Sequence, residues 1–320
     1  MPETTVWAGV DVAKATLDLA VSDHVTTHAN DEHGWTEIVT AVRQRGACVV
    51  LEATGQYELG LAAALEAHGV PFAIVNPRQV RAYAQACGVL AKTDRIDATV
   101  LARFGLACTP ARTVLPDEER HAIQVWLARR TQLVEMRTME RQRLQQARLA
   151  ALRTRIQAHL TWLATELRAL DRDLHTRLRE HPSWRTAFAL LVSVPGVGWL
   201  TAGRLLARLP ELGTTPTPRL AALVGVAPFP QDSGRRRGLR RIRAGRADVR
   251  SALYMAALAA TRATSRPNVL QTYHRTLRAR GKAPKVALVA TMRKLLTILN
   301  AILHQQRPWH AMAAADRLTA

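Results

Sequence analysis

The chain has 320 residues, of which 48% are hydrophobic, so it is long enough for two or three domains with packed cores. Its formal net charge of +20 predicts an anionic partner, most simply nucleic acid. A basic membrane-surface protein would need a stripe of Trp and Phe opposite a Lys-rich face, and the sequence shows no such stripe. An aromatic content of 5% is too low for base stacking to be the main binding mode.

Three features of the sequence predict a cytoplasmic protein that associates with the nucleoid and has no membrane partner. The N-terminus is not typical of a signal peptide. The apolar runs at 187–194 and 252–260 are too short to cross a bilayer. The cysteines follow no metal-ligand spacing and are expected to be small buried side chains in a reducing compartment: Cys48, Cys87 and Cys108.

Residues 1–108 are predicted to form an α/β domain with a mixed sheet. Short apolar runs first predict antiparallel strands and then strands that alternate with helices. The expected strands are 6–12, 15–22, 25–30, 48–52 and 71–75. The expected helices are 35–45, 58–68, 77–86 and one that begins within 92–97 and ends at 106.

Four acidic residues of this domain form a pattern. Asp11 lies on the first strand, and Glu52 ends a central strand, where open α/β sheets place their ligands. Asp94 and Asp97 are three residues apart, so they share one face of a helix. If that helix crosses the sheet near the two strand residues, the four carboxylates converge and raise one another's pKa values unless a counter-charge is present. Oxygen-only ligands suit Mg²⁺, and a pair of such ions stabilises phosphoryl transfer.

Each acid also has a purely structural explanation. Asp11 could be a turn residue, and Glu52 could cap the helix that follows it. Asp94 and Asp97 could be first-turn acids that the helix dipole favours, or they could pair with neighbouring basic residues. Considered together, with a basic chain and this order of strands, the four residues favour the metal site.

A helical coiled-coil arm is predicted for residues 109–184. Pro110 and Pro116 mark a linker, and the following segment contains neither Gly nor Pro up to residue 181. Apolar residues recur there at steps of three and four, as in a heptad seam: Leu149, Leu152, Ile156, Leu160, Leu163, Leu167, Leu170 and Leu174. Two long helices that turn near 146–154 explain this pattern. An internal hairpin and a dimerising coiled coil are equal alternatives, because a seam alone does not set the oligomeric state.

Residues 185–320 are predicted to form a mostly helical C-terminal domain. Helices are expected at 187–194 and 200–209, and the P-G-V-G turn between them resembles a helix-hairpin-helix element. In such an element Gly196 and Gly198 would let backbone N–H groups approach phosphate at a helix N-terminus. The alternative is an ordinary tight turn between two core helices. Further helices are expected at 218–223, 247–262, 268–280 and 286–304.

A Pro/Gly-rich loop in this domain presents Ser233. Pro228, Pro230 and Gly234 forbid a regular helix there. The loop continues into a basic run whose guanidinium groups would repel one another unless a polyanion lay among them: Arg235, Arg236, Arg237, Arg240, Arg241, Arg243, Arg246 and Arg250. Beside such a surface the serine is either a phosphate contact or a nucleophile that attacks phosphorus. The alternative is a turn serine in a solvated basic loop.

The order of Asp11, Glu52, Asp94 and Asp97 resembles the DEDD tetrad of the insertion sequence 110 family of bacterial transposases. Other similar motifs are N-P-R-Q-V-R at 76–81, K-T-D-R-I-D-A at 92–98, and G-V-A-P, D-S-G and G-R-A-D-V-R-S-A-L-Y-M-A-A-L in the C-terminal domain. The resemblance implies a RuvC-like, ribonuclease-H-type fold for the first domain. It also implies that Ser233 is the nucleophile, that the site is shared between subunits of a tetramer, and that a structured bridge RNA pairs with donor and target DNA. For the arm, the resemblance favours a dimerising coiled coil over an internal hairpin.

The sequence therefore predicts a DNA transposase or recombinase. Ser233 would attack a phosphodiester of double-stranded DNA and form a phosphoserine link, which can be rejoined without an external nucleotide. The acidic tetrad would hold Mg²⁺, which neutralises the phosphate and helps to activate the hydroxyl. One alternative is a metal-dependent junction nuclease, in which water attacks and Ser233 only binds phosphate. A second is a non-enzymatic nucleic-acid scaffold, in which Asp11 has no part in DNA processing.

Overall fold

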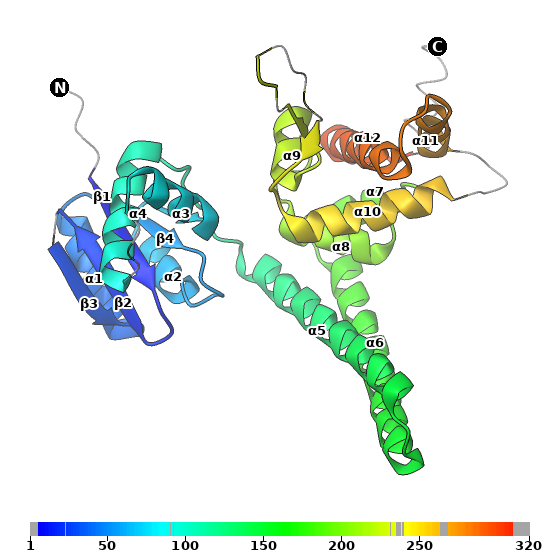
Figure 1. Ribbon diagram of the computed structural model, residues 1–320, viewed down its shortest axis with the longest axis horizontal. Coiled ribbons are helices and arrows are strands. Elements are labelled where there is room, and N and C mark those ends of the chain that lie inside the picture. Colours follow the sequence, from blue (N-terminus) through cyan, green and yellow to red (C-terminus); the bar gives the residue numbers. More distant parts are fainter. Residues whose placement is uncertain are drawn as a thin grey trace. The chain divides into compact units, whose positions relative to one another are not determined.

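The computed structural model describes residues 6–22, 24–89, 91, 93–230, 232–234, 238, 240–262 and 268–309 (Figure 1). Contacts divide the chain into two compact units, Met1–Pro116 and Asp117–Ala320, called here the N-terminal and C-terminal units. The long helices that were expected to form a separate arm lie in the C-terminal unit. The division into three domains at 108 and 184 stays a prediction.

A five-stranded mixed sheet forms the centre of the N-terminal unit. Its strands are β1 (Trp7–Val12), β2 (Thr16–Val21), β3 (His24–Ala29), β4 (Cys48–Glu52) and β5 (Phe72–Val75), in the spatial order β3-β2-β1-β4-β5. β1, β2 and β3 pair as antiparallel neighbours, whereas β4 pairs parallel with both β1 and β5. The predicted α/β class with a mixed sheet is confirmed, and this order of strands fits a ribonuclease-H-type domain.

Helices pack on both faces of this sheet. α1 (Glu32–Gln44) and α2 (Leu59–Ala67) share one apolar core with the strands, and α3 (Pro77–Ala86) and α4 (Asp94–Cys108) share another. α4 approaches β1 so closely that a Cβ on Gly9 would lie 2.2 Å from the carbonyl oxygen of Ala98. Only glycine fits at this position, and the close approach places the first turns of α4 beside the central strand.

Side chains at the helix starts explain where three of these helices begin. Asp31, Asn76 and Thr93 each accept a hydrogen bond from a backbone N–H of the first turn of α1, α3 and α4. Pro77 occupies the first position of α3, where no backbone N–H is needed. The cap at Thr93 has a functional consequence, because it begins α4 at Asp94.

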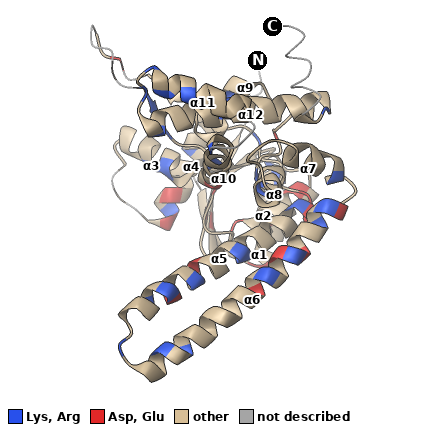
Figure 2. Ribbon diagram, turned by 90° about the vertical axis from the view of Figure 1, so that its right-hand side faces the viewer, with Lys and Arg blue, Asp and Glu red and all other residues tan. Residues whose placement is uncertain are grey.

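A long helical hairpin opens the C-terminal unit. α5 (Glu118–Gln146) and α6 (Ala150–Glu180) pack along each other and extend away from the remaining helices of this unit, with basic residues along both (Figures 1 and 2). Leu163, Leu167 and Leu170 of α6 are buried in a core that includes Leu133 of α5. The two long helices and the turn predicted near 146–154 are confirmed.

The far end of this hairpin leaves part of the predicted seam uncovered. The side chains of Leu149 and Leu152 are 72% and 47% exposed, whereas Leu167 is only 4% exposed. The internal hairpin therefore accounts for the part of the seam near the other helices. A contact with another subunit, which would make the arm a dimerising coiled coil, stays a prediction for the far end.

Shorter helices and one strand pair make up the rest of the described C-terminal unit. They are α7 (Arg185–Val192), α8 (Trp199–Arg208), α9 (Thr217–Val224), β6 (Pro228–Phe229), β7 (Arg241–Ile242), α10 (Ala247–Thr261), α11 (Val269–Ala279) and α12 (Pro284–Gln305). The apolar faces of these helices form one core, which also contains Ile123 and Leu127 of α5 and Leu174 and Leu178 of α6. The base of the hairpin is therefore anchored in the same core, and the mostly helical class is confirmed.

Within the described residues, α12 is the one helix long and apolar enough to cross a membrane by length and composition. The interior of the C-terminal unit explains this composition. Leu295, Leu296, Leu299 and Ile302 are all fully buried in its core. Their burial accounts for α12 as a core helix.

The prediction that the cysteines are buried is wrong for two of them. Cys48 is buried in β4, but Cys87 and Cys108 are exposed. Cys87 follows the last residue of α3, and Cys108 is the last residue of α4, so both lie where the chain leaves the packed face of a helix. All three thiols are free.

We predict that Leu167→Ala lowers the free energy of unfolding by about 2–5 kcal/mol, because truncation of a packed leucine leaves a cavity. Leu152→Ala is a matched control on the same helix, and we expect it to cost less than about 1 kcal/mol because its side chain is exposed. Urea unfolding followed by circular dichroism measures both. Both variants are measured at a protein concentration where the chain is monomeric, and a loss at Leu152 as large as that at Leu167 would then contradict the exposed tip.

Candidate active site

Two neighbouring parallel strands position the first pair of acids. β1 and β4 pair with Val10 opposite Leu51. Asp11 and Glu52 each follow this pair of residues, so both lie at the same edge of the sheet, and both are half-buried. Carboxyl ends of adjacent strands are where open α/β sheets bind their ligands.

The first turns of α4 supply the second pair. The backbone N–H of Asp97 donates to the carbonyl oxygen of Thr93 at 2.8 Å, which sets the helix from its cap onward. Asp94 and Asp97 are one turn apart and share a face of the helix. The four acids line one cleft of about 520 Å³ in the N-terminal unit, together with residues of α3. The structure therefore brings together the four acids that the sequence singled out.

Burial and mutual repulsion act on Asp11. Its pKa is raised from 3.8 to about 6, first by burial and then by the charges of Asp97, Asp94 and Glu52, while a backbone hydrogen bond from Val12 opposes the shift. The charges of the other three acids thus disfavour ionisation of Asp11. A cation in the cleft would remove that cost.

The ligand atoms of the cleft fit a hard divalent cation. All four acids offer carboxylate oxygens, which Mg²⁺ prefers, and neither His nor Cys appears among the described residues that line the cleft. In the described part of the chain, no group of three or more His, Cys, Asp or Glu side chains is placed so that it could hold a metal ion by itself. Mg²⁺ does not need one, because it keeps several waters and binds through one or two carboxylates.

Two basic residues of the cleft were not assigned to the site from the sequence. Arg78 and Arg81 of α3 line the same cleft as the acids. Their spacing of three residues places them on one face of the helix, and guanidinium groups bind phosphate oxygens well. The signal that could have found them is this spacing directly after β5, a buried strand that ends at the same edge of the sheet.

Ser233 lies between β6 and β7 in the C-terminal unit, and its side chain is exposed. The preceding residue, Asp232, makes hydrogen bonds within this loop. The Asp232 carboxylate accepts hydrogen bonds from the backbone N–H of Gly238 at 3.0 Å and from the Arg240 guanidinium at 2.5 Å. The bond from Arg240 is the main reason why the pKa of Asp232 is lowered. Because Ser233 and the acids belong to different units, their meeting stays a prediction.

The structure describes only some of the predicted arginines nearest to Ser233. Arg235, Arg236 and Arg237 lie outside the described residues. Arg240, Arg241 and Arg243 are exposed, as a nucleic-acid contact requires. Their binding role stays a prediction.

The two remaining arginines have internal partners. Arg246 directly precedes α10 at its N-cap position, where a cation opposes the helix dipole. It donates to both carboxylate oxygens of Glu211 at 2.7 Å. It also donates to the carbonyl oxygen of Arg208 at 2.9 Å. Arg250 donates to the carbonyl oxygen of Ala244 at 2.6 Å. These bonds fix the segment that leads from the Ser233 loop into α10. Contact of the same arginines with DNA stays a prediction.

Packing explains why the first glycine of the P-G-V-G turn, Gly196, is a glycine. Gly196 has a φ of +85°, and a Cβ there would lie 2.4 Å from the carbonyl oxygen of Ala256 on α10. Gly198 caps the start of α8, and a Cβ there would meet nothing within 4 Å. Close packing therefore requires Gly196, whereas binding of phosphate at Gly198 and the helix-hairpin-helix assignment stay predictions.

Comparison with known proteins matches most of the chain. Residues 8–152 match a family model described as "Transposase", and residues 188–274 match one described as "Transposase IS116/IS110/IS902 family". The pilin gene-inverting protein of Moraxella lacunata is 27% identical over 317 residues, which cover 95% of this chain and 97% of that protein. The uncharacterized 43.6 kDa protein of insertion element IS110 from Streptomyces coelicolor is 31% identical over 146 residues, which cover 45% of this chain and 34% of that protein.

One solved structure also aligns with the chain. It is T. thermophilus RuvC in complex with a Holliday junction substrate, and the alignment covers 35% of this chain and 99% of that chain at 15% identity. The TM-score is 0.26, which is too low to support a fold assignment. The ribonuclease-H-type assignment therefore depends on the order and direction of the strands.

We predict that Asp11→Asn stabilises the metal-free protein at neutral pH. The folded-state pKa of Asp11 is raised, so the protonated carboxyl adds to the free energy of unfolding. This contribution is present below the unfolded pKa near 4 and is lost as pH rises through about 6. After a discount for solvent screening of a half-exposed group, we expect a gain on the order of 1 kcal/mol at about pH 7.5 and none at about pH 4. Thermal unfolding in EDTA measures this, and a destabilised variant at neutral pH would contradict the raised pKa of Asp11.

Proposed function

Because the chain belongs to the IS110 family of transposases, we propose that it cuts and rejoins double-stranded DNA, with Ser233 as the attacking group. The observation that carries the proposal is the convergence of four acids from β1, β4 and α4 in one cleft: Asp11, Glu52, Asp94 and Asp97. A role in stability alone does not explain them, because burial and the neighbouring carboxylates raise the pKa of Asp11 and make its ionised form unfavourable. The gene-inverting activity in the name of one relative supports rejoining as well as cutting.

The proposed exchange at phosphorus is balanced. The Ser233 oxygen bonds to the scissile phosphorus, and the bond from phosphorus to the departing sugar oxygen breaks. The serine hydroxyl loses one proton, and the departing oxygen gains one. One phosphodiester replaces another, so the bond energy is kept, and a sugar hydroxyl of a second strand reverses the exchange and frees the serine.

The acidic cleft and the Ser233 loop contribute different parts of this reaction. The four carboxylates would hold Mg²⁺, which when bound supplies positive charge to the phosphate oxygens. Arg78 and Arg81 line the same cleft and would orient the phosphate. The pair between Asp232 and Arg240 holds the loop that presents the exposed Ser233 hydroxyl.

We propose that the complete site forms in an assembly of subunits, dimer to tetramer, which the family resemblance supports. The acids and Ser233 belong to different units of the chain. The exposed leucines at the tip of the α5–α6 hairpin support a contact between subunits. We further propose that a structured bridge RNA selects the DNA, which the family resemblance supports, and that the protein acts at the chromosome in the cytoplasm. A net charge of +20 suits a protein that binds nucleic-acid backbones while base pairing reads the sequence.

Trapping of a covalent protein–DNA adduct tests this function. The full chain is incubated with the DNA and RNA from either side of its reading frame in Mg²⁺, and adducts that survive denaturing electrophoresis are measured. We expect Ser233→Ala to lower adduct formation and strand joining by a factor on the order of 10³ or more. Ser251→Ala, which changes an exposed serine of α10, is the matched control and should retain both.

Two other outcomes separate the alternatives. Cleavage that persists in Ser233→Ala without an adduct would indicate a junction nuclease in which water attacks. An adduct that forms equally well in Asp97→Asn and in EDTA would contradict the metal site. If neither variant changes DNA processing, the chain is a scaffold and the proposal is wrong.

A further inference from the structure

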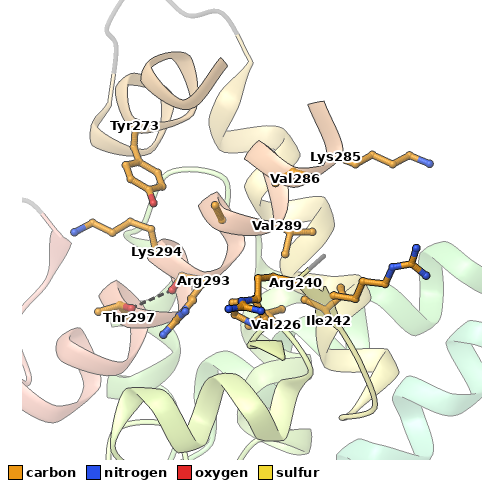
Figure 3. Close-up of a pocket in the computed structure, with 13 residues that line it drawn as sticks. Val226, Arg240, Ile242, Tyr273, Lys285, Val286, Val289, Arg293, Lys294 and Thr297 are labelled. Atoms are coloured by element: carbon orange, nitrogen blue, oxygen red, sulfur yellow. Dashed lines mark hydrogen bonds between the residues drawn. The ribbon is translucent and has the colours of Figure 1, made fainter. Parts of the chain in front are cut away.

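A cavity of about 730 Å³ lies in the C-terminal unit, where β7 meets α11 and α12 (Figure 3). It is distinct from the acidic cleft, which belongs to the N-terminal unit. Its volume lies in the range of sites that bind small organic groups. The chemistry proposed for Ser233 and the acids does not use it.

The rim of this cavity is basic. Arg241 contributes from β7, and Lys285, Arg293 and Lys294 contribute from α12. Arg240 also lines the cavity but is paired with a carboxylate. Among the described lining residues none is acidic. Charge complementarity therefore favours an anionic occupant.

The interior of the cavity is apolar, which a phosphate alone does not explain. Val226, Ile242, Val286 and Val289 line it, and the side chains of Ile242 and Val286 are 37% and 55% exposed. Tyr273 of α11 stands on the opposite side from Val226 and Ile242 (Figure 3) and is 36% exposed. An exposed aromatic ring beside apolar side chains suits a flat ring system. A nucleotide combines such a ring with an anionic phosphate.

The location of the cavity indicates which strand supplies the nucleotide. β7 contributes Arg241 and Ile242 to the lining, and it pairs with β6, with Phe229 opposite Arg241. Ser233 lies in the loop that joins these two strands. The cavity and the Ser233 loop thus share the β6–β7 strand pair, which links them along the chain.

We propose that the cavity holds one unpaired nucleotide of the DNA strand on which Ser233 acts. Its base lies between Tyr273 and Val289, and its phosphate lies beside Arg293 and Lys294. The cavity thereby keeps a nucleotide out of the duplex and fixes the strand relative to the Ser233 loop, at the usual cost of unstacking one base. This inference depends on the proposed function, because that function assigns Ser233 to a DNA strand.

Binding of fluorescein-labelled oligo(dT), and of a duplex of equal length, to the full chain tests the proposal by anisotropy. Tyr273→Ala should weaken oligo(dT) binding about 5-fold to 150-fold, the value of one stacked base, and should leave duplex binding within about twofold. Tyr254→Ala is the matched control, because Tyr254 of α10 is 38% exposed but does not line the cavity. It should change neither affinity.

Two further variants separate the cavity from the charge on its rim. Ala290→Trp fills the cavity without a change of charge and should weaken oligo(dT) binding at least as much as Tyr273→Ala. Lys294→Gln should lower the slope of log K against log salt by about 0.7 for oligo(dT), the value of one phosphate contact. Lys282→Gln, at a lysine that does not line the cavity, should leave the slope unchanged. Thermal unfolding checks that each variant is folded.

The proposal is overturned if Tyr273→Ala and Ala290→Trp leave oligo(dT) affinity within about twofold, or if they weaken duplex binding equally. It is overturned in favour of RNA if these variants lose affinity for oligo(rU) but keep it for oligo(dT). Ser233→Ala should retain oligo(dT) binding. A failed adduct experiment with intact binding thus counts against the nucleophile alone, whereas unchanged binding in the cavity variants counts against the cavity alone.

Discussion

Parallel pairing of β1 with β4 brings Asp11 and Glu52 to one edge of the sheet, and the close approach of α4 to Gly9 adds two more carboxylates to the same cleft. Burial and the charges of the other three acids together raise the pKa of Asp11. Grouping four acids in one cleft lowers the stability of the fold, so stability alone does not explain the arrangement. This arrangement supports the proposal that the cleft holds a cation, which would neutralise an anionic phosphate.

Charge is arranged differently in the C-terminal unit. The basic run after Ser233 is not one uniform surface for phosphate, because Arg246 is held by Glu211 and Arg240 by Asp232. These internal pairs shape the Ser233 loop and its base. The other exposed arginines and the lysines of α12 are then the groups left for the proposed contact with nucleic acid. Part of the positive charge thus has a structural role.

Local patterns in the sequence were enough to predict most helices and strands, including the long helices of the hairpin and the turn between them. The choice of the four acids also came from the sequence, but their convergence depends on α4 lying on β1, which a glycine at position 9 allows and no local pattern shows. The partner of Arg246 was not predictable either, because Glu211 is far along the chain. The cavity beside β7 was missed for the same reason, since its lining comes from segments that are distant in sequence. The exposure of Cys87 and Cys108 shows that composition alone is a poor guide to burial.

The central claim is that an acidic cleft and the Ser233 hydroxyl act on one phosphate. The most direct measurement is a structure of the assembled protein bound to its DNA and RNA, with an intact scissile phosphate. The account predicts a Ser233 oxygen about 3–3.5 Å from the scissile phosphorus, with a cleft from the same or another subunit at the same phosphate. A structure in which every Ser233 lies far from every cleft, with DNA in place for cleavage, would contradict it.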